Sequence, residues 1–313
     1  MSDPEIIIFS AKGRESLSNL QQKAVEEIAT VQYIANLSPL SDDRLIQLCQ
    51  TANYIGLTRR TCTDFHAKII RSLPHLKGIS VYTTGIEWID LVELQTCNIA
   101  MKFLPDYSAI TVAEHAIGLL LTLSRRIHLS DRKAMSEISP SVSLRGWELS
   151  GKKIGILGLG RIGSRIAHLA KAFNMEVSYY DPKVEIHPEF SAVSFEQIIQ
   201  QSDVIMLSAS LNRENPIIIT NKVLEAMQQG VYIINPARPA LVDNPAIISA
   251  IQSGKVAGYA VDDNPFSLDE LRRLEAGRIL QTGHTGWYSD EAMERGTEMW
   301  INNLVELAKT TDK

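Results

Sequence analysis

Residues 158–163, GLGRIG, have the GxGxxG spacing with which a backbone binds the pyrophosphate of a dinucleotide. A strand-like apolar run, KKIGILGL, leads into them and a helix-like run follows. In this context Gly158 makes the turn, Gly160 lets the backbone approach the phosphates, and Gly163 packs the helix against the strand. The N-terminus of that helix then faces the phosphates. The pattern predicts a dinucleotide cofactor.

The type of nucleotide follows from Asp181, about 20 residues beyond the glycines at the end of the strand-like run EVSYYD. A carboxylate at that position binds the ribose hydroxyls and repels a 2′-phosphate. Lys183 is a weaker indication in the opposite direction, because a lysine can pair with the 2′-phosphate of NADP. On balance the sequence predicts NAD rather than NADP.

Three segments farther along the chain carry the side chains of a hydride-transfer site, and each follows a predicted strand. They are INPARPALVD with Arg238, AVDDNPFS with Asp262 and Asp263, and LQTGHTGWYS with His284. The carboxyl ends of the strands face the ligand crevice in an open α/β sheet, so we expect these segments at the cofactor. An arginine suits carboxylate recognition, and an imidazole exchanges protons near neutral pH. Such a histidine usually needs a carboxylate behind it, and AVDDNPFS leaves open whether one is supplied.

The elements around these motifs alternate between strand-like and helix-like runs. In the N-terminal third, EIIIF, VQYIANL, YIGLT and GISVYT are predicted strands, and LIQLCQ and FHAKIIRSL are predicted helices. In the second series, Ser194 and Gln197 form a capping box that opens the helix FEQIIQQ. Thr220 is predicted to cap a helix that stops at Gly230, and Ser289 to cap the C-terminal helix. This βαβ rhythm predicts parallel sheets.

We therefore expect an α/β protein with two doubly wound parallel-sheet domains, the second a Rossmann NAD-binding domain. The NAD-binding domain is predicted at residues 105–287. Residues 1–104 plus 288–313 are predicted to form a flavodoxin-like, discontinuous substrate-binding domain, because the C-terminal helix lies beyond the last strand of the second series. Residues 111–134 are predicted to form one long helix, apolar over too wide a face for a surface helix, which suits domain linking or dimerisation.

Composition is that of an ordinary soluble globular protein and excludes several classes of function. The net charge is −5 and no run of Lys and Arg marks a nucleic-acid surface, so direct nucleic-acid binding is not expected. Cys49, Cys62 and Cys97 have neither CxxC nor zinc spacing, so we expect reduced thiols, no metal site and a cytoplasmic location. The most apolar segment, AIGLLLTL, is far shorter than the ~20 residues of a membrane span, so no membrane association is expected.

Nearly the whole chain resembles the D-isomer-specific 2-hydroxyacid dehydrogenases. The matching stretches include YIGLTRRT, HLKGISVYTTGIEWIDL, VAEHAIGLLL, GWELSGKKIGILGLGRIG and INPARPALVD. HTGWYSDEA and the PFS of residues 265–267 are most similar to the C-terminal binding protein branch, and phosphoglycerate dehydrogenases are also similar. The resemblance implies an enzyme that uses NAD to interconvert a 2-oxo acid and a D-2-hydroxy acid, and a homodimer formed through the helix of residues 111–134.

The resemblance also implies a role for each matching residue. Arg238 clamps the carboxylate and keto oxygen of the substrate, His284 donates the proton to the carbonyl, and Asp262 binds the nicotinamide carboxamide. The further expected contacts are Thr83, Thr84 and Gly85, whose backbone amides hold the substrate carboxylate, Arg59, Arg60 and Trp287 beside the substrate side chain, and Arg161, Ile162, Ser210, Ala237 and His284 beside the cofactor. A surface role for Arg60 and ordinary packing for Trp287 remain alternatives.

The chain departs from the family pattern behind the histidine. Members usually carry D-V-x-E-x-E-P, whose second acid bonds to the histidine, whereas here Asp262 is followed directly by Asp263 and Asn264. Aligning on the PFS places Asn264 at the glutamate position, and aligning from Asp262 places Ser267 there. Asp263 is then the nearest carboxylate in the sequence. Pro239 stands where glycine is common and puts the conformation of the arginine loop in doubt.

The leading interpretation is an NAD-dependent oxidoreductase of 2-oxo acids with retuned acid–base catalysis, in which Asn264 or Asp263 replaces the catalytic glutamate. The missing glutamate motivates two alternatives. One is an NAD(H)-binding regulatory protein like the C-terminal binding proteins, and the other is a non-redox lyase or isomerase on the same scaffold. The residues do not identify the substrate.

Overall fold

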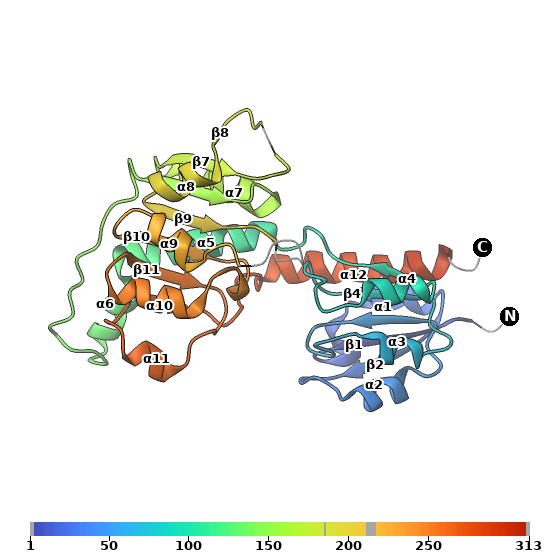
Figure 1. The fold of residues 1–313 in the computed structure, drawn as a ribbon. Coiled ribbons are helices and arrows are strands. Elements are labelled where there is room, and N and C mark those ends of the chain that lie inside the picture. The colour runs from blue at the N-terminus through green and yellow to red at the C-terminus, as the bar shows by residue number, and fades with distance from the viewer. Residues whose placement is uncertain (1–2, 185, 211–216, 311–313) are drawn as a thin grey trace. The chain divides into compact units, whose positions relative to one another are not determined.

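The computed structural model describes residues 3–184, 186–210 and 217–310, and the chain divides into two compact units. The first comprises Met1–Tyr107 with Ser289–Lys313, and the second Ser108–Tyr288. Each unit is a parallel sheet flanked by helices (Figure 1). The fold confirms the prediction of an α/β protein with two parallel-sheet domains.

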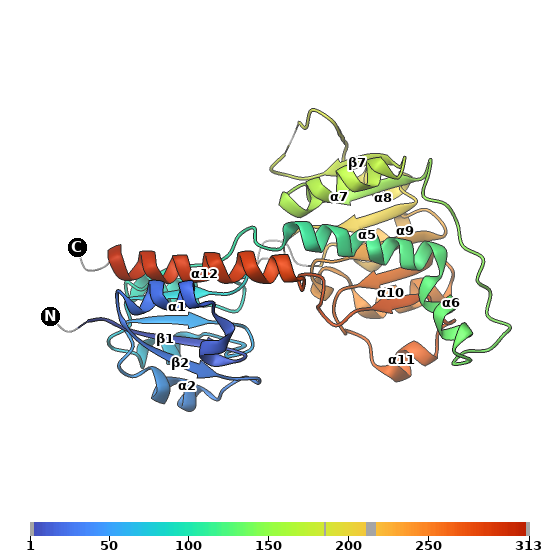
Figure 2. The same ribbon diagram turned by 180° about the vertical axis from the view of Figure 1, so that it is seen from behind.

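The first unit has a five-stranded sheet in the order β2-β1-β3-β4-β5, which is the flavodoxin-like order. The C-terminal helix lies against this sheet beside α1 (Figure 2), and the Trp300 Nε1 on it donates to the Ser80 carbonyl at 2.9 Å. The elements are β1 (Glu5–Ser10), η1 (Gly13–Ser16), α1 (Asn19–Glu26), β2 (Thr30–Ala35), α2 (Asp42–Cys49), β3 (Tyr54–Leu57), α3 (Ala67–Arg71), β4 (Gly78–Val81), α4 (Leu91–Thr96), β5 (Ala100–Lys102) and α12 (Asp290–Thr310).

The second unit has a seven-stranded parallel sheet in the order β12-β11-β10-β9-β6-β7-β8. The elements are α5 (Ala109–Arg125), α6 (Ile127–Ala134), β6 (Lys153–Leu157), α7 (Arg161–Ala172), β7 (Glu176–Tyr180), β8 (Ser191–Ala192), α8 (Phe195–Gln201), β9 (Val204–Leu207), α9 (Asn221–Ala226), β10 (Val231–Asn235), η2 (Pro239–Leu241), α10 (Asn244–Gln252), β11 (Val256–Val261), α11 (Leu268–Arg272) and β12 (Ile279–Gln281). The strand order reverses at β6, which pairs with β7 on one side and β9 on the other. Loops at the carboxyl ends of strands on either side of this switch point are where such sheets bind ligands.

The prediction of one helix over residues 111–134 is wrong. Two helices, α5 and α6, meet at Arg126, whose φ of 54° is left-handed and ends the first helix. The carbonyl of Ser124, in the last turn of α5, accepts a hydrogen bond from the Trp147 backbone N–H. This partner, far along the chain, stabilises the helix end without the glycine that usually marks one.

Helix caps follow the sequence more closely than helix lengths do. The capping box of Ser194 and Gln197 is present, and the Ser289 side chain accepts from Ala292 N at the start of α12. Thr220 caps α9 as predicted, but that helix ends at Ala226 rather than near Gly230. After Ala226 the chain turns to the extended conformation at Met227, so helix geometry is lost a turn early.

Candidate active site

The loop after β6 has the shape that the glycine pattern predicts. Gly158 has a φ of +96°, and a Cβ there would lie 2.9 Å from the Ala209 nitrogen. A Cβ on Gly163 would collide with the Gly158 carbonyl, whereas Gly160 has open space around that position. Gly160 is also the residue from which α7 starts. The loop is therefore tightly packed except where a pyrophosphate approaches the helix N-terminus.

The Asp181 carboxylate is anchored against this loop. One oxygen accepts from Leu159 N at 2.7 Å and the other from Lys183 N at 2.8 Å. Each oxygen retains a further acceptor position that a ribose hydroxyl can use. The loop and this carboxylate therefore fit a dinucleotide. The other sequence candidates for cofactor contact follow strands on the same side of the sheet's strand order, at the start of α7, after β9 and after β10: Arg161 and Ser210 are exposed, and Ile162 and Ala237 half-buried.

The loop after β10 presents Arg238. The buried Asn235 side chain accepts from Ala237 N at 3.1 Å and donates to the Arg238 carbonyl at 2.8 Å, so it fixes the backbone turn. Arg238 is extended (φ −142°, ψ 136°), the conformation that a following proline favours. Pro239 then starts η2, where its missing N–H costs nothing. The doubt about Pro239 is thus resolved, since this proline suits the loop. Sequence reasoning missed Asn235, although it stands in the INPAR segment.

Asp262 holds together the loop that carries the histidine. Its Oδ1 accepts from the Thr282 hydroxyl and from Thr285 N, both at 2.8 Å, and its Oδ2 accepts from Gly286 N at 2.8 Å. Burial raises the pKa of this carboxyl, but hydrogen bonds from His115, Thr282, Gly286 and Thr285 outweigh burial and lower it to about 2. The three bonds at 2.8 Å occupy three of the roughly four acceptor positions of this carboxylate, and the His115 Nε2 lies farther away, at 3.5 Å from Oδ1. Most of the hydrogen-bonding capacity of Asp262 therefore holds the loop of residues 282–286. No sequence pattern indicates that Thr282 or His115 contacts this carboxylate.

We expect the Asp262 carboxylate to stabilise the fold at neutral pH. Its folded pKa of about 2 lies below the reference value of 3.8, so the stabilisation is present above about pH 4 and is lost as the pH falls towards 2. The shift corresponds to about 2 kcal/mol. Asp262→Asn is expected to lower the free energy of unfolding at pH 7 and to weaken its acid dependence, measured by urea unfolding across this range. Asp269→Asn, an exposed carboxylate of α11, is the matched control, and an equal effect of both variants would contradict the assignment.

His284 lies beside the Asp263 carboxylate. The histidine Nδ1 is 3.5 Å from Asp263 Oδ2, and the two side chains are 44% and 40% exposed. The other oxygen, Asp263 Oδ1, accepts from Asn264 N at 2.8 Å, which orients the carboxylate. Both Gly283 and His284 have positive φ, 64° and 62°. A left-handed histidine is uncommon, and backbone strain of this kind clusters at functional sites.

The Asn264 amide contacts the residue before the histidine. Its Nδ2 lies 3.0 Å from the position of a Cβ on Gly283, so the side chain packs on the glycine before the histidine. Of the two candidates for the replaced glutamate, the structure brings the Asp263 carboxylate to the imidazole. With a carboxylate at Nδ1, the opposite ring nitrogen, Nε2, is left for proton exchange.

The first-unit candidates form a loop after β4. The Thr83 hydroxyl bonds with both the amide and the carbonyl of Gly85, at 3.2 and 3.1 Å, and Trp88 Nε1 donates to the same carbonyl at 3.0 Å. Two of the three expected backbone donors are therefore engaged within the chain, since the Gly85 amide donates to the Thr83 hydroxyl and the Thr83 amide donates to the Val81 carbonyl at 2.9 Å. Of the three, the Thr84 amide is the donor that this loop offers to a substrate. Arg59 pairs with Glu87 at 3.1 Å, and Arg60 is exposed.

Trp287 follows directly on the histidine loop. Its ring meets that of Tyr288 edge-on, with centroids 5.2 Å apart, and the Tyr288 side chain is 66% exposed. This pair adds aromatic surface to the second unit next to residues 282–286.

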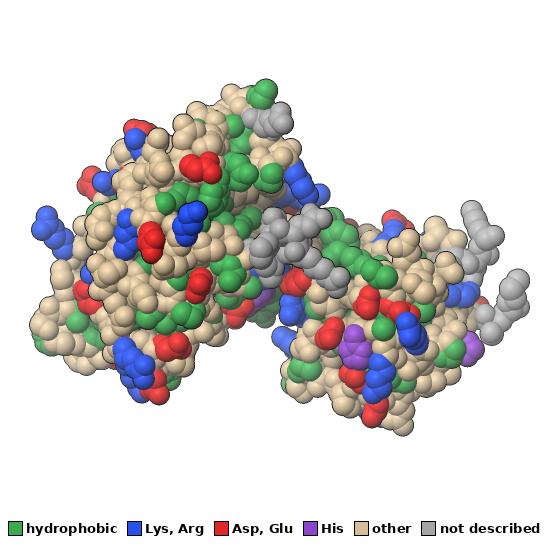
Figure 3. All heavy atoms as spheres, viewed as in Figure 1, with side chains coloured by type: hydrophobic (Ala, Val, Ile, Leu, Met, Phe, Trp, Pro, Cys, Tyr) green, Lys and Arg blue, Asp and Glu red, His purple; other side chains and the backbone are tan. Residues whose placement is uncertain are grey.

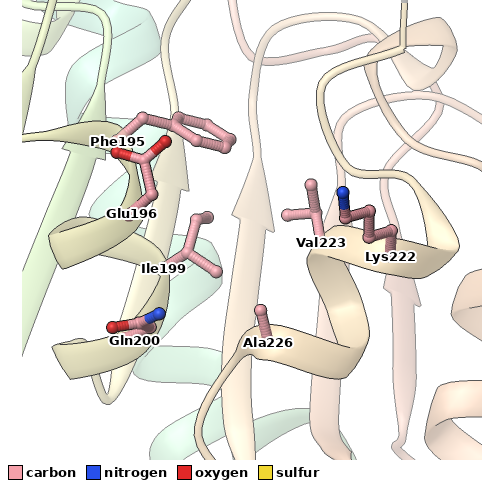
Figure 4. A pocket seen from close by; sticks show the side chains of 7 residues that line it. All are labelled: Phe195, Glu196, Ile199, Gln200, Lys222, Val223 and Ala226. Atoms are coloured by element: carbon pink, nitrogen blue, oxygen red, sulfur yellow. The ribbon is translucent and has the colours of Figure 1, made fainter.

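One cavity of the second unit, of about 320 Å³, opens between α8 and α9 (Figure 4) and contains none of these side chains. It is lined by Phe195, Glu196, Ile199, Gln200, Lys222, Val223 and Ala226. Acidic and basic side chains are interspersed over the face of the molecule that Figure 3 shows.

Within the described residues, no cluster of three or more His, Cys, Asp or Glu side chains is placed to hold a metal ion. Among the helices of residues 3–184, 186–210 and 217–310, none has the length and apolar content needed to cross a membrane.

Known proteins match both the sequence and the fold. Residues 117–286, more than half of the chain, match the family described as D-isomer specific 2-hydroxyacid dehydrogenase, NAD binding domain. The chain belongs to this family. It is similar to a glyoxylate reductase of Thermococcus litoralis, with 33% identity over 77% of this chain and 77% of the relative. It is similar to a D-3-phosphoglycerate dehydrogenase of Archaeoglobus fulgidus, with 30% identity over 86% of this chain and 52% of the relative. The structure of an Aquifex aeolicus D-lactate dehydrogenase complexed with NAD and lactic acid has a TM-score of 0.80 and 26% identity, covering 97% and 95% of the two chains.

Membership confirms that the protein is an NAD-dependent oxidoreductase of the D-isomer specific 2-hydroxyacid dehydrogenase family. The NAD-binding match spans the glycine loop, Asp181, the Arg238 loop and the His284 loop.

Proposed function

We propose that the protein reduces a 2-oxo acid to the D-2-hydroxy acid with NADH, with Arg238 as the carboxylate clamp, His284 as the acid and Asp263 as its carboxylate partner. The observation that carries this proposal is the Asp263 Oδ2 at 3.5 Å from His284 Nδ1. A carboxylate beside the imidazole supports a dehydrogenase over a regulatory or a non-redox role. We further propose a cytoplasmic homodimer that contacts its partner through residues 111–134, which lie in α5 and α6. The proposed domain limits are residues 105–287 and 1–104 plus 288–313.

Each side chain has a distinct task. The Arg238 guanidinium binds the substrate carboxylate and stabilises charge that develops on the keto oxygen. His284 gives the proton that this oxygen needs, and Asp263 orients the ring. Asp262 holds the loop of residues 282–286 and offers its remaining acceptor position to the nicotinamide carboxamide. NADH, when bound, supplies the hydride.

The substrate side chain is proposed to lie against Trp287 or to pair with Arg60. A 2-oxo acid with an aromatic or branched tail suits the tryptophan, whereas a second acidic or phosphate group suits the arginine. The other expected contact is the loop of Thr83, Thr84 and Gly85.

NADH oxidation with a panel of 2-oxo acids, followed by absorbance, tests the proposal. The panel includes aromatic, branched, phosphorylated and dicarboxylic members. We expect turnover with one class of 2-oxo acid. The class that reacts also shows whether the substrate side chain contacts Trp287 or Arg60. Bound NADH without turnover of any member would reject the dehydrogenase assignment.

The preference for NAD is expected to depend on Asp181. Asp181→Ala removes the acceptors for the ribose hydroxyls and the charge that repels a 2′-phosphate, so NADH is expected to bind about 10-fold more weakly while NADPH gains relative to it. Titration with both cofactors measures the ratio. Lys183→Ala is the control at the same loop and is expected to leave the preference for NADH in place. An unchanged NADH to NADPH ratio in Asp181→Ala would contradict the assignment.

A further inference from the structure

His115 lies next to the machinery just described but has no task in it. It is on α5, with 24% of its side chain exposed. Its Nε2 is 3.0 Å from the Thr282 hydroxyl oxygen and 3.5 Å from Asp262 Oδ1. Its ring also packs on Gly286, since a Cβ there would lie 2.9 Å from His115 Cδ2. The histidine therefore contacts the loop of residues 282–286 at both ends.

The donor and acceptor of each hydrogen bond that links His115, Thr282 and Asp262 follow from the number of hydrogens available. The Thr282 hydroxyl has one hydrogen, and it goes to Asp262 Oδ1, where the distance is 2.8 Å. The contact between Thr282 and His115 must then be donated by the ring, so His115 Nε2 carries a hydrogen. The sequence of donors is His115 Nε2–H, Thr282 Oγ1–H and the Asp262 carboxylate. Asp262 in turn accepts the backbone N–H groups of Thr285 and Gly286, immediately beyond His284.

We propose that His115 is a positioning residue of the active site: through the Thr282 hydroxyl it holds the Asp262 carboxylate, and with it the loop that carries His284. This inference rests on the proposed role of His284. The backbone of Gly283 and His284 is in the left-handed region, so the loop needs such outside support to keep its shape. The donor is supplied by α5, an element remote in sequence from the loop.

Substitutions that differ only in the position of one N–H group test this role. The amide nitrogen of Gln reaches about as far as the histidine Nε2, whereas that of Asn reaches only as far as Nδ1. We expect His115→Asn to lower kcat about 10-fold with little change in the KM for the 2-oxo acid, because a small displacement of a catalytic group is costly. His115→Gln is expected to retain most of kcat. His75→Asn, at an exposed histidine of the first unit, is the control.

The ring tautomer gives a readout that needs no turnover. In protein labelled with ¹⁵N-histidine, the His115 signals are identified by their loss in His115→Gln. We expect a hydrogen on Nε2, and a neutral ring with its hydrogen on Nδ1 would overturn the proposal. Equal kcat in His115→Asn and the wild-type enzyme would also overturn it. If the wild-type protein turns over no 2-oxo acid, the proposed function fails, and the tautomer still decides whether His115 donates to Thr282.

Discussion

Replacing Arg238 by alanine is expected to lower kcat/KM for 2-oxo acid reduction by about 10³-fold. The guanidinium is the group proposed to bind the substrate carboxylate, and it also stabilises the developing charge on the keto oxygen. Losing one such donor from an anion site costs about 10²–10³-fold, and losing the ground-state contact adds to that. The Asn235 hydrogen bonds fix the backbone of this loop independently of the side chain, so the fold and NADH binding are expected to survive.

Two variants distinguish the loss of carboxylate binding by Arg238 from the general effect of removing a positive charge. Arg272→Ala removes an exposed arginine of α11 in the same unit and is expected to leave turnover unchanged. Arg238→Lys keeps the charge but not the two-pronged geometry, and an intermediate rate is expected. Steady-state kinetics with a 2-oxo acid and NADH titrations measure the two effects separately. Unchanged turnover in Arg238→Ala would mean that another group binds the substrate carboxylate.

The parts of the site that the sequence predicted well are those set by local backbone chemistry. The glycines of residues 158–163 follow directly from steric limits, since Gly158 needs a positive φ and Gly163 has no room for a side chain. A helix cap such as Ser194 depends on the capping residue and the residue three positions later, so the sequence predicts it as well. The α/β fold class was predicted from the alternation of strand-like and helix-like runs.

The parts that the sequence left open depend on contacts between distant segments. The choice between Asp263 and Asn264 turns on two consecutive left-handed residues, Gly283 and His284, and a left-handed histidine has no reliable sequence signature. His115 reaches Asp262 only because α5 lies next to β11, and no spacing rule connects the two. The break at Arg126 likewise depends on a partner more than twenty residues away, Trp147 N.

Removing the carboxylate beside the histidine is expected to have the second large effect. Asp263→Asn keeps a side chain of the same shape but cannot offset the charge of a protonated imidazole. In a serine-protease triad the same exchange costs about 10⁴-fold, largely through the wrong tautomer. Here the two groups are 3.5 Å apart and about two-fifths exposed, so water screens much of their interaction. We therefore expect kcat to fall by about 10- to 100-fold, measured with saturating NADH and 2-oxo acid.

The neighbouring amide supplies the matched control for this pair. Asn264 packs on Gly283, so Asn264→Ala is expected to cost less than about 3-fold in kcat, and a larger loss than in Asp263→Asn would mean that residue 264 occupies the catalytic position. A double-mutant cycle with His284→Gln then separates the two readings of Asp263. If the carboxylate acts through the imidazole, Asp263→Asn has little further effect once His284 is gone, because the two residues work as one unit. Additive losses would instead show that Asp263 acts through the loop backbone, where its Oδ1 accepts the Asn264 N–H, and the acid partner of His284 would have to be sought outside residues 260–267.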